Sequence, residues 1–464
     1  MYKLYITPLL LGFSSLVLSQ GMSGLKVSAY SGIIGIGLQP ANLASSPYSV
    51  DVNIIGVSAT AVVKSFLPET GIGNTFYEGD QYSIGSMFTK KQENFFVNAN
   101  VFMPSASYRI DEKSGLAFTW RYRVVAYGSV SNSSLSLFAE NDFETKKLGD
   151  IPLIESMLGV ANTWEEFGMS YGRNIYDKGR HKVDVGLSAK YLRGGASGYV
   201  EVNGVNADYD KNTNTLNEVE GKFSMMYNQE VDQISEGEST KLFNSSGFGM
   251  NVGVNYEYKS AKYLDKKTDR QNQPNYLFKV STGFRDVGKI KFKASENSGS
   301  YTLTQKEPID ADYFNNLSSI DELSKRLENT FVVDTIVLSE YSLRLPTTWN
   351  FNIDWNIWKN FYGNFYMDFT GVQMRESFFR SEMLNQYKFS GRFEKAKYGF
   401  YTSLDYNKFS KWGSSISFRY SILYLGVNNL VKLSGDDTLN TLGVILTLRI
   451  PILSKGTTKK GRIF

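Results

Sequence analysis

Residues 345–370 alternate between apolar and polar side chains in two successive runs. The first run has large apolar groups at every second position, over Trp349, Asn350, Phe351, Asn352, Ile353, Asp354, Trp355, Asn356 and Ile357. The second run, 361–369, repeats the pattern after a tight turn at Lys359 and Asn360. Because successive side chains of a strand point to opposite faces, each run has one apolar and one polar face. Runs of about ten residues, tilted by roughly 45°, cross a bilayer core, so the pattern predicts a hairpin of a transmembrane β-barrel. A soluble β-sandwich alternates in the same way, and one hairpin does not separate the two.

The same alternation recurs along the chain. Further strands are predicted near 50–63, 97–103, 116–124, 165–175, 183–191, 250–258, 275–286, 383–393, 396–406, 413–420, 422–428 and 442–450. This is about 14 strands, an even number, as in single-chain outer-membrane barrels. The sequence therefore predicts an all-β fold, a transmembrane antiparallel β-barrel.

The connections between these strands alternate in length, which a soluble sandwich does not require. Short turns fall at 111–115, 176–180, 358–360 and 393–396, and long segments at 65–92, 129–163, 194–245 and 294–340. Short turns at one rim and long loops at the other are typical of outer-membrane barrels, with the short turns in the periplasm. We therefore expect both termini in the periplasm and the long loops outside the cell. Residues 151–158 and 318–327 are predicted to be helical.

The N-terminus and the composition indicate export. Residues 1–19 have the basic Lys3, a short apolar stretch and the small Ser19, as a secretory signal does. The 464 residues include no cysteine, which excludes disulfides and a lipid anchor on cysteine. The net charge of +4 gives no sign of nucleic-acid binding, and the 14% of aromatic residues suits aromatic girdles at the membrane interfaces. We expect a signal at 1–19, a hatch-like segment at 20–49, the barrel at 50–450, a basic tail at 451–464, and location in the outer membrane of a Gram-negative bacterium.

Short motifs give the chain a resemblance to a known family. They are Gln39-Pro-Ala-Asn-Leu-Ala44, Val50-Asp-Val-Asn-Ile-Ile55, Leu345-Pro346 and Tyr424-Leu-Gly-Val-Asn-Asn-Leu430. With these motifs the chain resembles an uncharacterised family of Bacteroidota outer-membrane barrels, which is similar to the long-chain fatty-acid transporter (FadL-like) barrels. The resemblance implies a 14-stranded barrel with an N-terminal hatch inside it, opened by an Asn-Pro-Ala element. The matching positions here are Gln39, Pro40, Ala41 and Asn42, with Gln39 where those barrels have asparagine.

The apolar residues of the N-terminal segment support a hatch. Ile34, Ile36 and Leu38 precede the first predicted strand, and they would be exposed if the segment extended into the periplasm. We therefore expect residues 24–45 to fold into the barrel mouth or lumen and obstruct it. An ordinary periplasmic lead-in is the alternative.

Charged residues on the polar faces of the predicted strands form the candidate site. They are Arg121, Arg123, Asp184, Lys190, Glu257, Asp354, Asp368, Lys388, Arg392 and Arg449. Their mixed signs predict paired networks that line the lumen. The pattern leaves open whether these networks only brace the wall or also form a substrate path.

The sequence offers little for catalysis or metal binding. The single histidine, His181, falls at a predicted turn. The stretch 208–218 resembles a calcium loop but has Thr213 and Val219 where glycine and glutamate are needed, so it is interpreted as a polar hairpin tip. We expect no enzymatic activity, no metal site and no cofactor.

Two functions remain open. The first is transport or binding of a small, hydrophobic molecule, with outer-membrane lipid around the barrel. The alternative is a structural or docking barrel of a cell-surface or secretion assembly, with protein partners at its loops or periplasmic rim. A plugged lumen with a gap in the wall favours transport, and large exposed apolar patches on the loops favour docking. No nucleic-acid partner is expected.

Overall fold

The computed structural model describes most, but not all, of the chain. The described residues are 28–64, 94–130, 155–210, 212–231, 243–260, 276–296, 298–305, 307–310, 320–332, 336–337, 339–370, 383–408, 411–432 and 439–453, with the single positions 24, 274, 313 and 381. The predicted signal at 1–19 and residues 454–464 of the predicted tail lie outside the described residues. Residues 451–453, assigned to the tail from sequence, are the end of the last strand.

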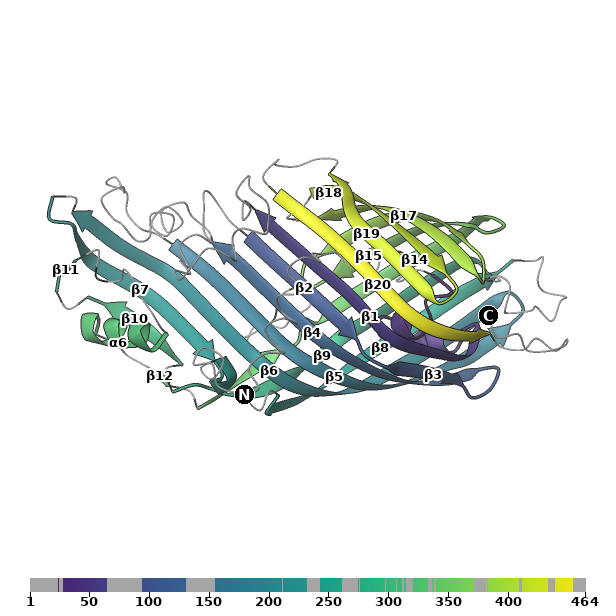
Figure 1. The fold of residues 1–464 in the computed structure, drawn as a ribbon, viewed down its shortest axis with the longest axis horizontal. Helices are drawn as coiled ribbons and strands as arrows, with labels where there is room; N and C mark the ends of the chain where they lie inside the picture. Colours follow the sequence, from purple (N-terminus) through teal and green to yellow (C-terminus); the bar gives the residue numbers. More distant parts are fainter. Residues whose placement is uncertain are drawn as a thin grey trace, which may run out of the picture.

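Within the described residues the strands form a closed antiparallel ring of 14 (Figure 1). In ring order these are β1 (Tyr48–Lys64), β2 (Asn94–Phe102) continued by β3 (Ser105–Arg109), β4 (Ser114–Val130), β5 (Glu155–Lys178), β6 (His181–Asp210), β8 (Ser245–Lys259), β9 (Tyr276–Lys293), β13 (Glu340–Arg344) continued by β14 (Thr348–Trp358), β15 (Phe361–Phe369), β16 (Gln386–Glu394), β17 (Tyr398–Asn407), β18 (Lys411–Tyr420), β19 (Leu423–Lys432) and β20 (Leu439–Leu453). The ring closes where β1 pairs with β20, from Tyr48 opposite Leu453 to Lys64 opposite Leu439. The predicted antiparallel barrel of about 14 strands is confirmed.

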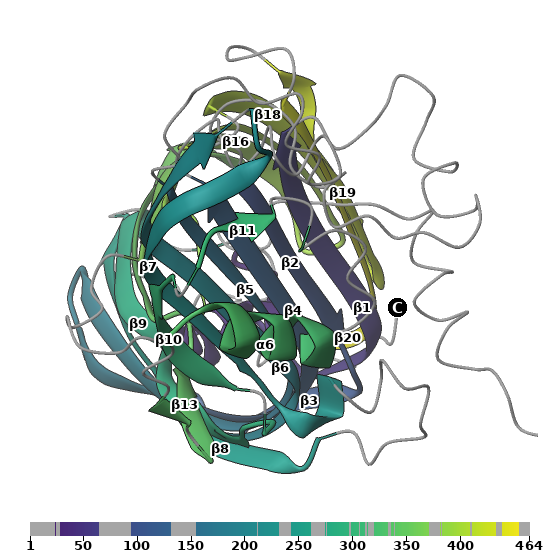
Figure 2. The same ribbon diagram turned by 90° about the vertical axis from the view of Figure 1, so that its left-hand side faces the viewer.

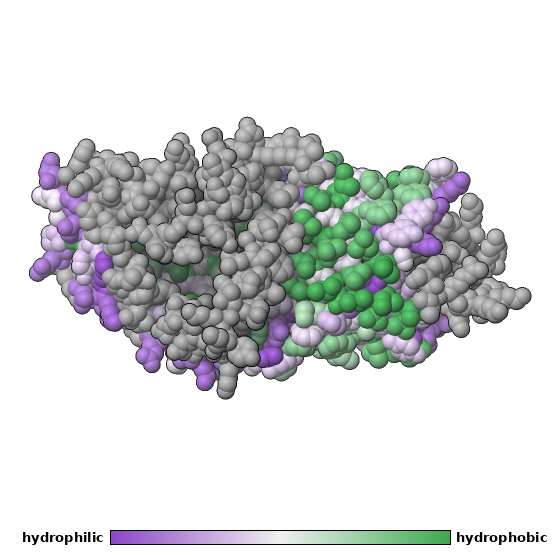
Figure 3. Space-filling model, in the orientation of Figure 1, coloured by the Kyte–Doolittle hydropathy of each residue, from purple (hydrophilic) through white to green (hydrophobic). Residues whose placement is uncertain are grey.

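Side chains alternate across the wall as the sequence pattern predicts. On β20, Leu446 and Ile450 are 45% and 44% exposed, while Thr447 and Arg449 between them are at most 1% exposed. The outward positions of many other strands are large and apolar, including Leu116, Met169, Leu187, Phe389, Phe400, Leu404 and Phe418. Figure 3 shows this apolar surface gathered on the right-hand half of the molecule, as a membrane-spanning band requires. The described residues contain no helix that is both long and apolar enough to cross a membrane.

The two ends of the barrel differ. One, the short-turn end, has tight turns at Gly179, Lys359 and Ser421, each in the left-handed region of φ, together with the ring-closing ends of β1 and β20. β8 also ends there, at Lys259, and β9 begins there, at Tyr276. At the opposite end β6 extends beyond its last pair with β8, at Gly194, and pairs with a strand outside the ring.

That opposite end has a further sheet and a helix. β7 (Thr215–Tyr227) pairs with β6, with β10 (Gly299–Thr304) and with β11 (Ile309–Asp310), and β12 (Ile336–Val337) pairs with β10. Helix α6 (Ile320–Thr330) lies at this end, in front of the barrel interior in Figure 2. We call these elements the outer extension.

The structure contradicts part of the loop prediction at this end of the barrel. Large parts of the expected loops 129–163, 194–245 and 294–340 are strands, because the chain there satisfies its backbone hydrogen bonds by pairing with its own neighbours. The expected helix at 151–158 is wrong from Glu155 onward, where β5 begins. The helix expected at 318–327 is confirmed as α6.

Substituting arginine on the outward face should destabilise the barrel in a depth-dependent way. Leu446→Arg should lower the free energy of unfolding in lipid vesicles by about 2–4 kcal/mol, because it puts a charge near mid-membrane. Ile450→Arg, on the same face of β20 but nearer the short-turn end, should cost about 0–1 kcal/mol. Urea titration of both variants measures the difference, and equal losses would contradict the membrane placement.

Candidate functional site

The N-terminal segment lies inside the barrel. It forms a short helix, α3 (Gly32–Ile36), and a 3-10 helix, η1 (Pro40–Leu43), near the short-turn end (Figure 1). Its isoleucines are at most 3% exposed and share one apolar cluster with inward-facing wall residues, including Phe102, Tyr401, Tyr424 and Ile445. Residues 28–46, which belong to the hatch-like segment expected from sequence, are called the hatch below.

A row of five glycines crosses the wall where η1 lies. Gly115, Gly172, Gly186, Gly253 and Gly283 occupy directly paired positions on β4, β5, β6, β8 and β9. Side chains at these positions would point into the lumen, because their neighbours two residues away along each strand are inward-facing. The row therefore removes one layer of side chains from five adjacent strands.

Atoms of the hatch occupy the space beside four of these glycines, on β4, β5, β6 and β8. A Cβ added at Gly186 would lie 2.3 Å from both Pro40 C and Ala41 N, and one at Gly172 would lie 2.6 Å from Leu43 Cβ. Real Cβ atoms do not approach other atoms this closely, so only glycine lets η1 pack directly on the strand backbones. None of these five glycines was predicted from sequence to contribute to the site.

Two of the four predicted hatch residues make polar contacts with the wall. Gln39 Nε2 donates to the carbonyl oxygen of Thr282 at 3.1 Å. Asn42 Oδ1 accepts hydrogen bonds from Asn255 Nδ2 at 3.0 Å and from Lys279 Nζ at 3.1 Å. Pro40 and Ala41 are buried and contribute the backbone that lies on the glycine row. All four predicted hatch residues therefore lie against β8, β9 or the glycine row.

A buried ion pair holds the start of the hatch to the seam between β1 and β20. Arg449 Nη1 lies 3.2 Å from Asp51 Oδ2, and Arg449 Nη2 donates to the carbonyl oxygen of Tyr30 at 2.5 Å. The same Asp51 oxygen accepts the backbone N–H of Ile33 at 2.7 Å. Arg449, predicted from sequence as a lumen residue, thus binds the hatch, while Asp51 was missed.

A second anchor lies on β16 to β18. Glu394 accepts the N–H of Ala29 at 3.1 Å and the hydroxyl of Tyr401 at 2.9 Å. The Arg419 guanidinium lies over the Tyr30 ring at 4.9 Å. Burial, reinforced by the Glu394 carboxylate, raises the pKa of Tyr30, so that its phenol remains neutral.

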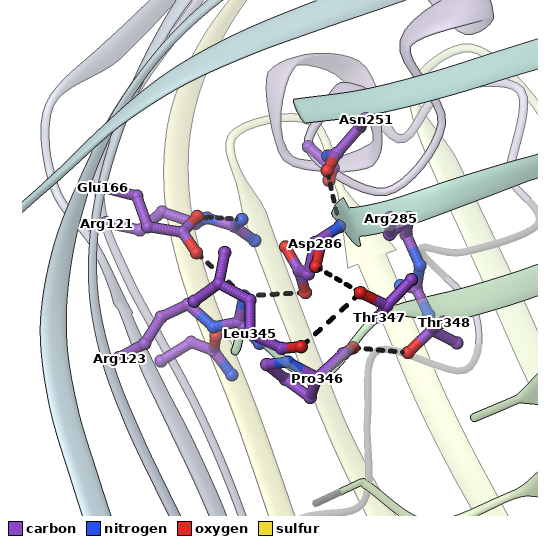
Figure 4. A network of polar contacts seen from close by, with 12 residues as sticks. Arg121, Arg123, Glu166, Asn251, Arg285, Asp286, Leu345, Pro346, Thr347 and Thr348 are labelled. Carbon is purple, nitrogen blue, oxygen red and sulfur yellow. Dashed lines mark hydrogen bonds and ion pairs between the residues drawn. The ribbon is translucent and has the colours of Figure 1, made fainter. Parts of the chain in front are cut away.

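A charged cluster lies beside the hatch, in the middle of the lumen (Figure 4). It combines Arg121, Arg123 and Lys190 with Glu166 and Asp286. Arg123 Nη1 is 2.8 Å from both carboxylates, Lys190 Nζ is 2.6 Å from Asp286, and Arg121 Nε is 3.1 Å from Glu166. All five residues are at most 8% exposed, so each charge depends on its partners for the solvation that water would supply.

The backbone of β9 brings Asp286 into this cluster. Asp286 lies in the left-handed region at φ 56°, where the pairing of β8 and β9 shifts register, and its N–H donates to Asn251 Oδ1 at 2.9 Å. Opposite this bulge Leu345, Pro346 and Thr347 separate β13 from β14, and Thr347 Oγ1 donates to the Asp286 carbonyl at 2.9 Å. The sequence pattern could not show that Arg285 and Asp286, neighbours in the chain, both face the lumen.

An apolar layer covers the charged cluster on the side away from the hatch. It consists of Val62, Phe96, Val125, Trp164, Leu192, Ile290, Phe292, Ala294, Tyr341, Leu343, Leu345 and Leu384, all nearly inaccessible. Trp164 joins the two layers, because its Nε1 donates to Glu166 at 3.0 Å and Arg123 lies 4.8 Å from its ring. We call these residues the apolar layer.

The apolar layer was missed because the lumen was expected to be polar. The signal in the sequence is a stretch where both faces of a strand become apolar, as at Val124 and Val125 or at Tyr191 and Leu192. In β4 and β6 these pairs follow directly after the charged Arg123 and Lys190. Because such pairs were interpreted as the ends of strands, the inward-facing residues that form the apolar layer were not predicted.

The other predicted lumen charges lie in separate pairs around the wall. Arg392 is 2.5 Å from Asp354 and stacks at 4.3 Å on Tyr362. Two further pairs are Arg285 with Asp368 at 2.6 Å and Lys388 with Asp405 at 3.1 Å.

A further group of charges surrounds hatch residue Ser45. Lys182 lies 3.0 Å from Asp184 and 3.3 Å from Glu257, and Glu257 lies 3.6 Å from Lys279. The Ser45 hydroxyl hydrogen-bonds with Lys182 and Asp184. Each of the ten charges predicted from sequence is therefore buried beside an opposite charge.

The residues considered for catalysis and metal binding are isolated. His181 is exposed at the turn between β5 and β6, with Nδ1 2.8 Å from the Tyr256 hydroxyl. Asp210 and Thr215 pair at the tip of the β6–β7 hairpin, where the calcium-like stretch lies. Over the described ranges no group of three potential ligands could hold a metal ion.

Adding one methyl group to the glycine row should displace the hatch. Gly186→Ala places a Cβ against the hatch backbone, which should weaken docking by about 1–3 kcal/mol through overpacking. Gly198→Ala, on the same strand with nothing within 4 Å of the added atom, is the control. Single-channel recording in planar bilayers should show more frequent open events for Gly186→Ala only, and identical traces would mean that the hatch does not depend on this contact.

Removing a charge from the buried cluster should cost far more than removing its neighbour in the chain, which belongs to a partly exposed ion pair. Glu166→Gln leaves Arg121, Arg123 and Lys190 with one carboxylate and should lower the free energy of unfolding by about 3–5 kcal/mol. Glu165→Gln loses a pair with Arg193, 3.2 Å away, whose side chain is 41% exposed, and should cost about 1 kcal/mol or less. Urea denaturation of the two variants in vesicles compares them, and a similar cost for both would mean that water reaches the cluster.

Comparison with solved structures finds barrels at low identity. The chain is similar to the toluene transporter TbuX of Ralstonia pickettii (10% identity, TM-score 0.37, 89% of this chain and 92% of that chain). It is similar to the toluene transporter TodX of Pseudomonas putida (9%, 0.37, 91% and 93%) and to a Pseudomonas aeruginosa FadL homologue (8%, 0.24, 89% and 91%). No curated protein matches the sequence.

The described strands form a closed β-barrel with large apolar side chains on its outer face. The family described as "Family of unknown function (DUF5723)" matches residues 40–428, which begin within the hatch and end in β19. Because this segment is most of the chain, the protein belongs to that family.

Proposed function

We propose that this barrel binds a small hydrophobic molecule in its lumen and transports it across the outer membrane. The observation that carries the proposal is the apolar layer. Outward-facing apolar groups are required by the surrounding lipid, but no lipid contacts the inward face. Twelve large or apolar side chains gathered there need a different reason.

Two reasons are available for an apolar layer inside the wall. Packing alone would stabilise the barrel, and the nearly complete burial of Trp164 and Leu192 is consistent with it. Ligand binding uses the same chemistry, since pockets for small molecules are mostly apolar with a few polar groups at fixed positions. The Glu166 and Arg123 side chains beside Trp164 supply such polar groups.

The order of the layers defines a path. Short turns face the periplasm in outer-membrane barrels, so the outer extension faces the outside. A molecule that enters from outside meets the apolar layer first, then the charged cluster, then the hatch. Release into the periplasm therefore requires displacement of the hatch, which is held by apolar packing on the wall as well as by hydrogen bonds and ion pairs.

One feature favours the alternative function, a docking barrel. The outer extension, with β7, β10, β11, β12 and α6, is outside the closed ring and is not needed to span the membrane. Such a sheet presents a surface for a protein partner. Catalysis has less support, because within the described part of the chain His181 hydrogen-bonds to the Tyr256 hydroxyl and to no carboxylate that would make it a general base.

An apolar probe separates these functions. Cells producing the protein should take up radiolabelled naphthalene faster than cells without it. Leu192→Asn puts an amide in the apolar layer and should slow uptake roughly fivefold or more, since an unpaired buried amide costs about 1–3 kcal/mol. Leu216→Asn, the same change at a buried leucine in the outer extension, is the control.

Heat-modifiability first shows whether the variants are folded, and uptake is compared only between folded proteins. Slower uptake for Leu192→Asn alone supports transport through the apolar layer. Equal uptake by cells with and without the wild-type protein would reject transport of this class of molecule and leave the docking function. Equal uptake by wild type and both variants would remove the apolar layer from the path.

A further inference from the structure

Four aromatic rings form a continuous patch on the outer wall at the short-turn end. Trp358 stacks on Phe361 with centroids 5.9 Å apart, Phe361 contacts Phe393 at 4.8 Å, and Phe393 contacts Tyr398 at 6.1 Å. Trp358, Phe361 and Tyr398 are 60%, 45% and 36% exposed. We call these four residues the rim patch.

Two lysines lie over the rim patch. Lys359 Nζ is 4.6 Å from the centroid of the Trp358 ring, and Lys395 Nζ is 5.6 Å from Phe393 and 5.5 Å from Tyr398. Neither lysine forms a salt bridge with any residue that the structure describes, and both are exposed. Their ammonium groups therefore rest on aromatic faces with their N–H donors directed to the surroundings.

The carboxylate next to Lys395 in the chain points away from the two lysines. Glu394 precedes Lys395 but is fully buried, because it points into the lumen and binds Ala29 of the hatch. Other short turns differ: Lys113 adjoins Asp111 and Glu112, and Lys259 pairs with Asp177.

Backbone hydrogen bonds keep the two lysine-bearing turns together. The Glu394 N–H donates to the Asn360 carbonyl at 2.9 Å, and the Lys395 N–H donates to the Tyr398 carbonyl at 2.8 Å. Asn356 Nδ2 donates to the Lys359 carbonyl at 3.0 Å. The two ammonium groups are thus carried on a firmly bonded pair of hairpin turns at the edge of the apolar band.

We propose that the rim patch and its two lysines bind the headgroup of an anionic phospholipid from the periplasmic leaflet. The phosphate accepts hydrogen bonds from Lys359 and Lys395, and the rings occupy the boundary between headgroup and acyl chains, where aromatic side chains are favoured. The acyl chains then lie on outward apolar groups such as Ile357 and Phe389, which are 64% and 49% exposed. A zwitterionic headgroup brings its own ammonium close to the two lysines and is disfavoured.

Native mass spectrometry of the detergent-purified full-length barrel tests the proposal. The probes are phosphatidylglycerol and phosphatidylcholine with the same acyl chains, each titrated separately. The first phosphatidylglycerol bound should bind more tightly than phosphatidylcholine. Lys359→Gln with Lys395→Gln should weaken it by roughly fivefold for each ammonium removed, with phosphatidylcholine unaffected.

A matched double variant controls for the general charge of the rim. Lys113→Gln with Lys178→Gln removes two charges from other turns of the same end and should leave phosphatidylglycerol binding unchanged. Equal binding of the two lipids, an equal loss in both double variants, or no loss in Lys359→Gln with Lys395→Gln would each overturn the proposal. The last result, together with loss of a defined acidic protein partner in that variant, would assign the rim patch to a protein instead.

Discussion

The hydrogen bonds between β1 and β20 are the interaction on which the rest of this structure depends. Inside a bilayer no water is available for unpaired N–H and C=O groups, so a sheet can span it only when it has no free edge. The pairing from Tyr48 to Lys64 against 439–453 removes the last edge. Closure also determines the interior, because about eight strands enclose a space that side chains alone can fill, and 14 enclose a wider one.

The hatch fills part of that wide interior, and the glycine row allows the hatch to pack closely on the wall. A strand wall with ordinary side chains would keep another segment at a distance, but the absence of side chains at Gly115, Gly172, Gly186 and Gly253 lets the hatch pack directly on four strands. Close packing alone would leave the polar groups of the hatch without partners. Asp51, Glu394, Asn255 and Lys279 supply those partners from four different strands, so the hatch is recognised by the closed ring and not by any single hairpin.

The charged cluster and the apolar layer have opposite energetic requirements within a few ångströms of each other. Buried charges are stable only when every one is paired, and neighbouring apolar groups strengthen those pairs by excluding water. Trp164 satisfies both, with its ring among apolar neighbours and its N–H on Glu166. Along the lumen, an apolar region is therefore followed directly by a polar region. A channel lined by charges of one sign lacks such a boundary.

The sequence by itself predicted the barrel, because the alternation of apolar and polar residues in each strand is visible within about ten residues. It does not depend on which other strands pair with that strand. The hairpin at 348–369, the strand number and the inward direction of Arg121, Asp354 and Arg449 follow from period-two spacing alone. Partners and register were decided by the tertiary structure. Glu166 and Asp286 meet Arg123 only because β5 and β9 are brought to β4 by ring closure and by a bulge, and the five glycines align only through the pairing of β4, β5, β6, β8 and β9. Such contacts join residues on different strands, 43 positions apart for Arg123 and Glu166 and 163 for Arg123 and Asp286, and no local periodicity contains that information.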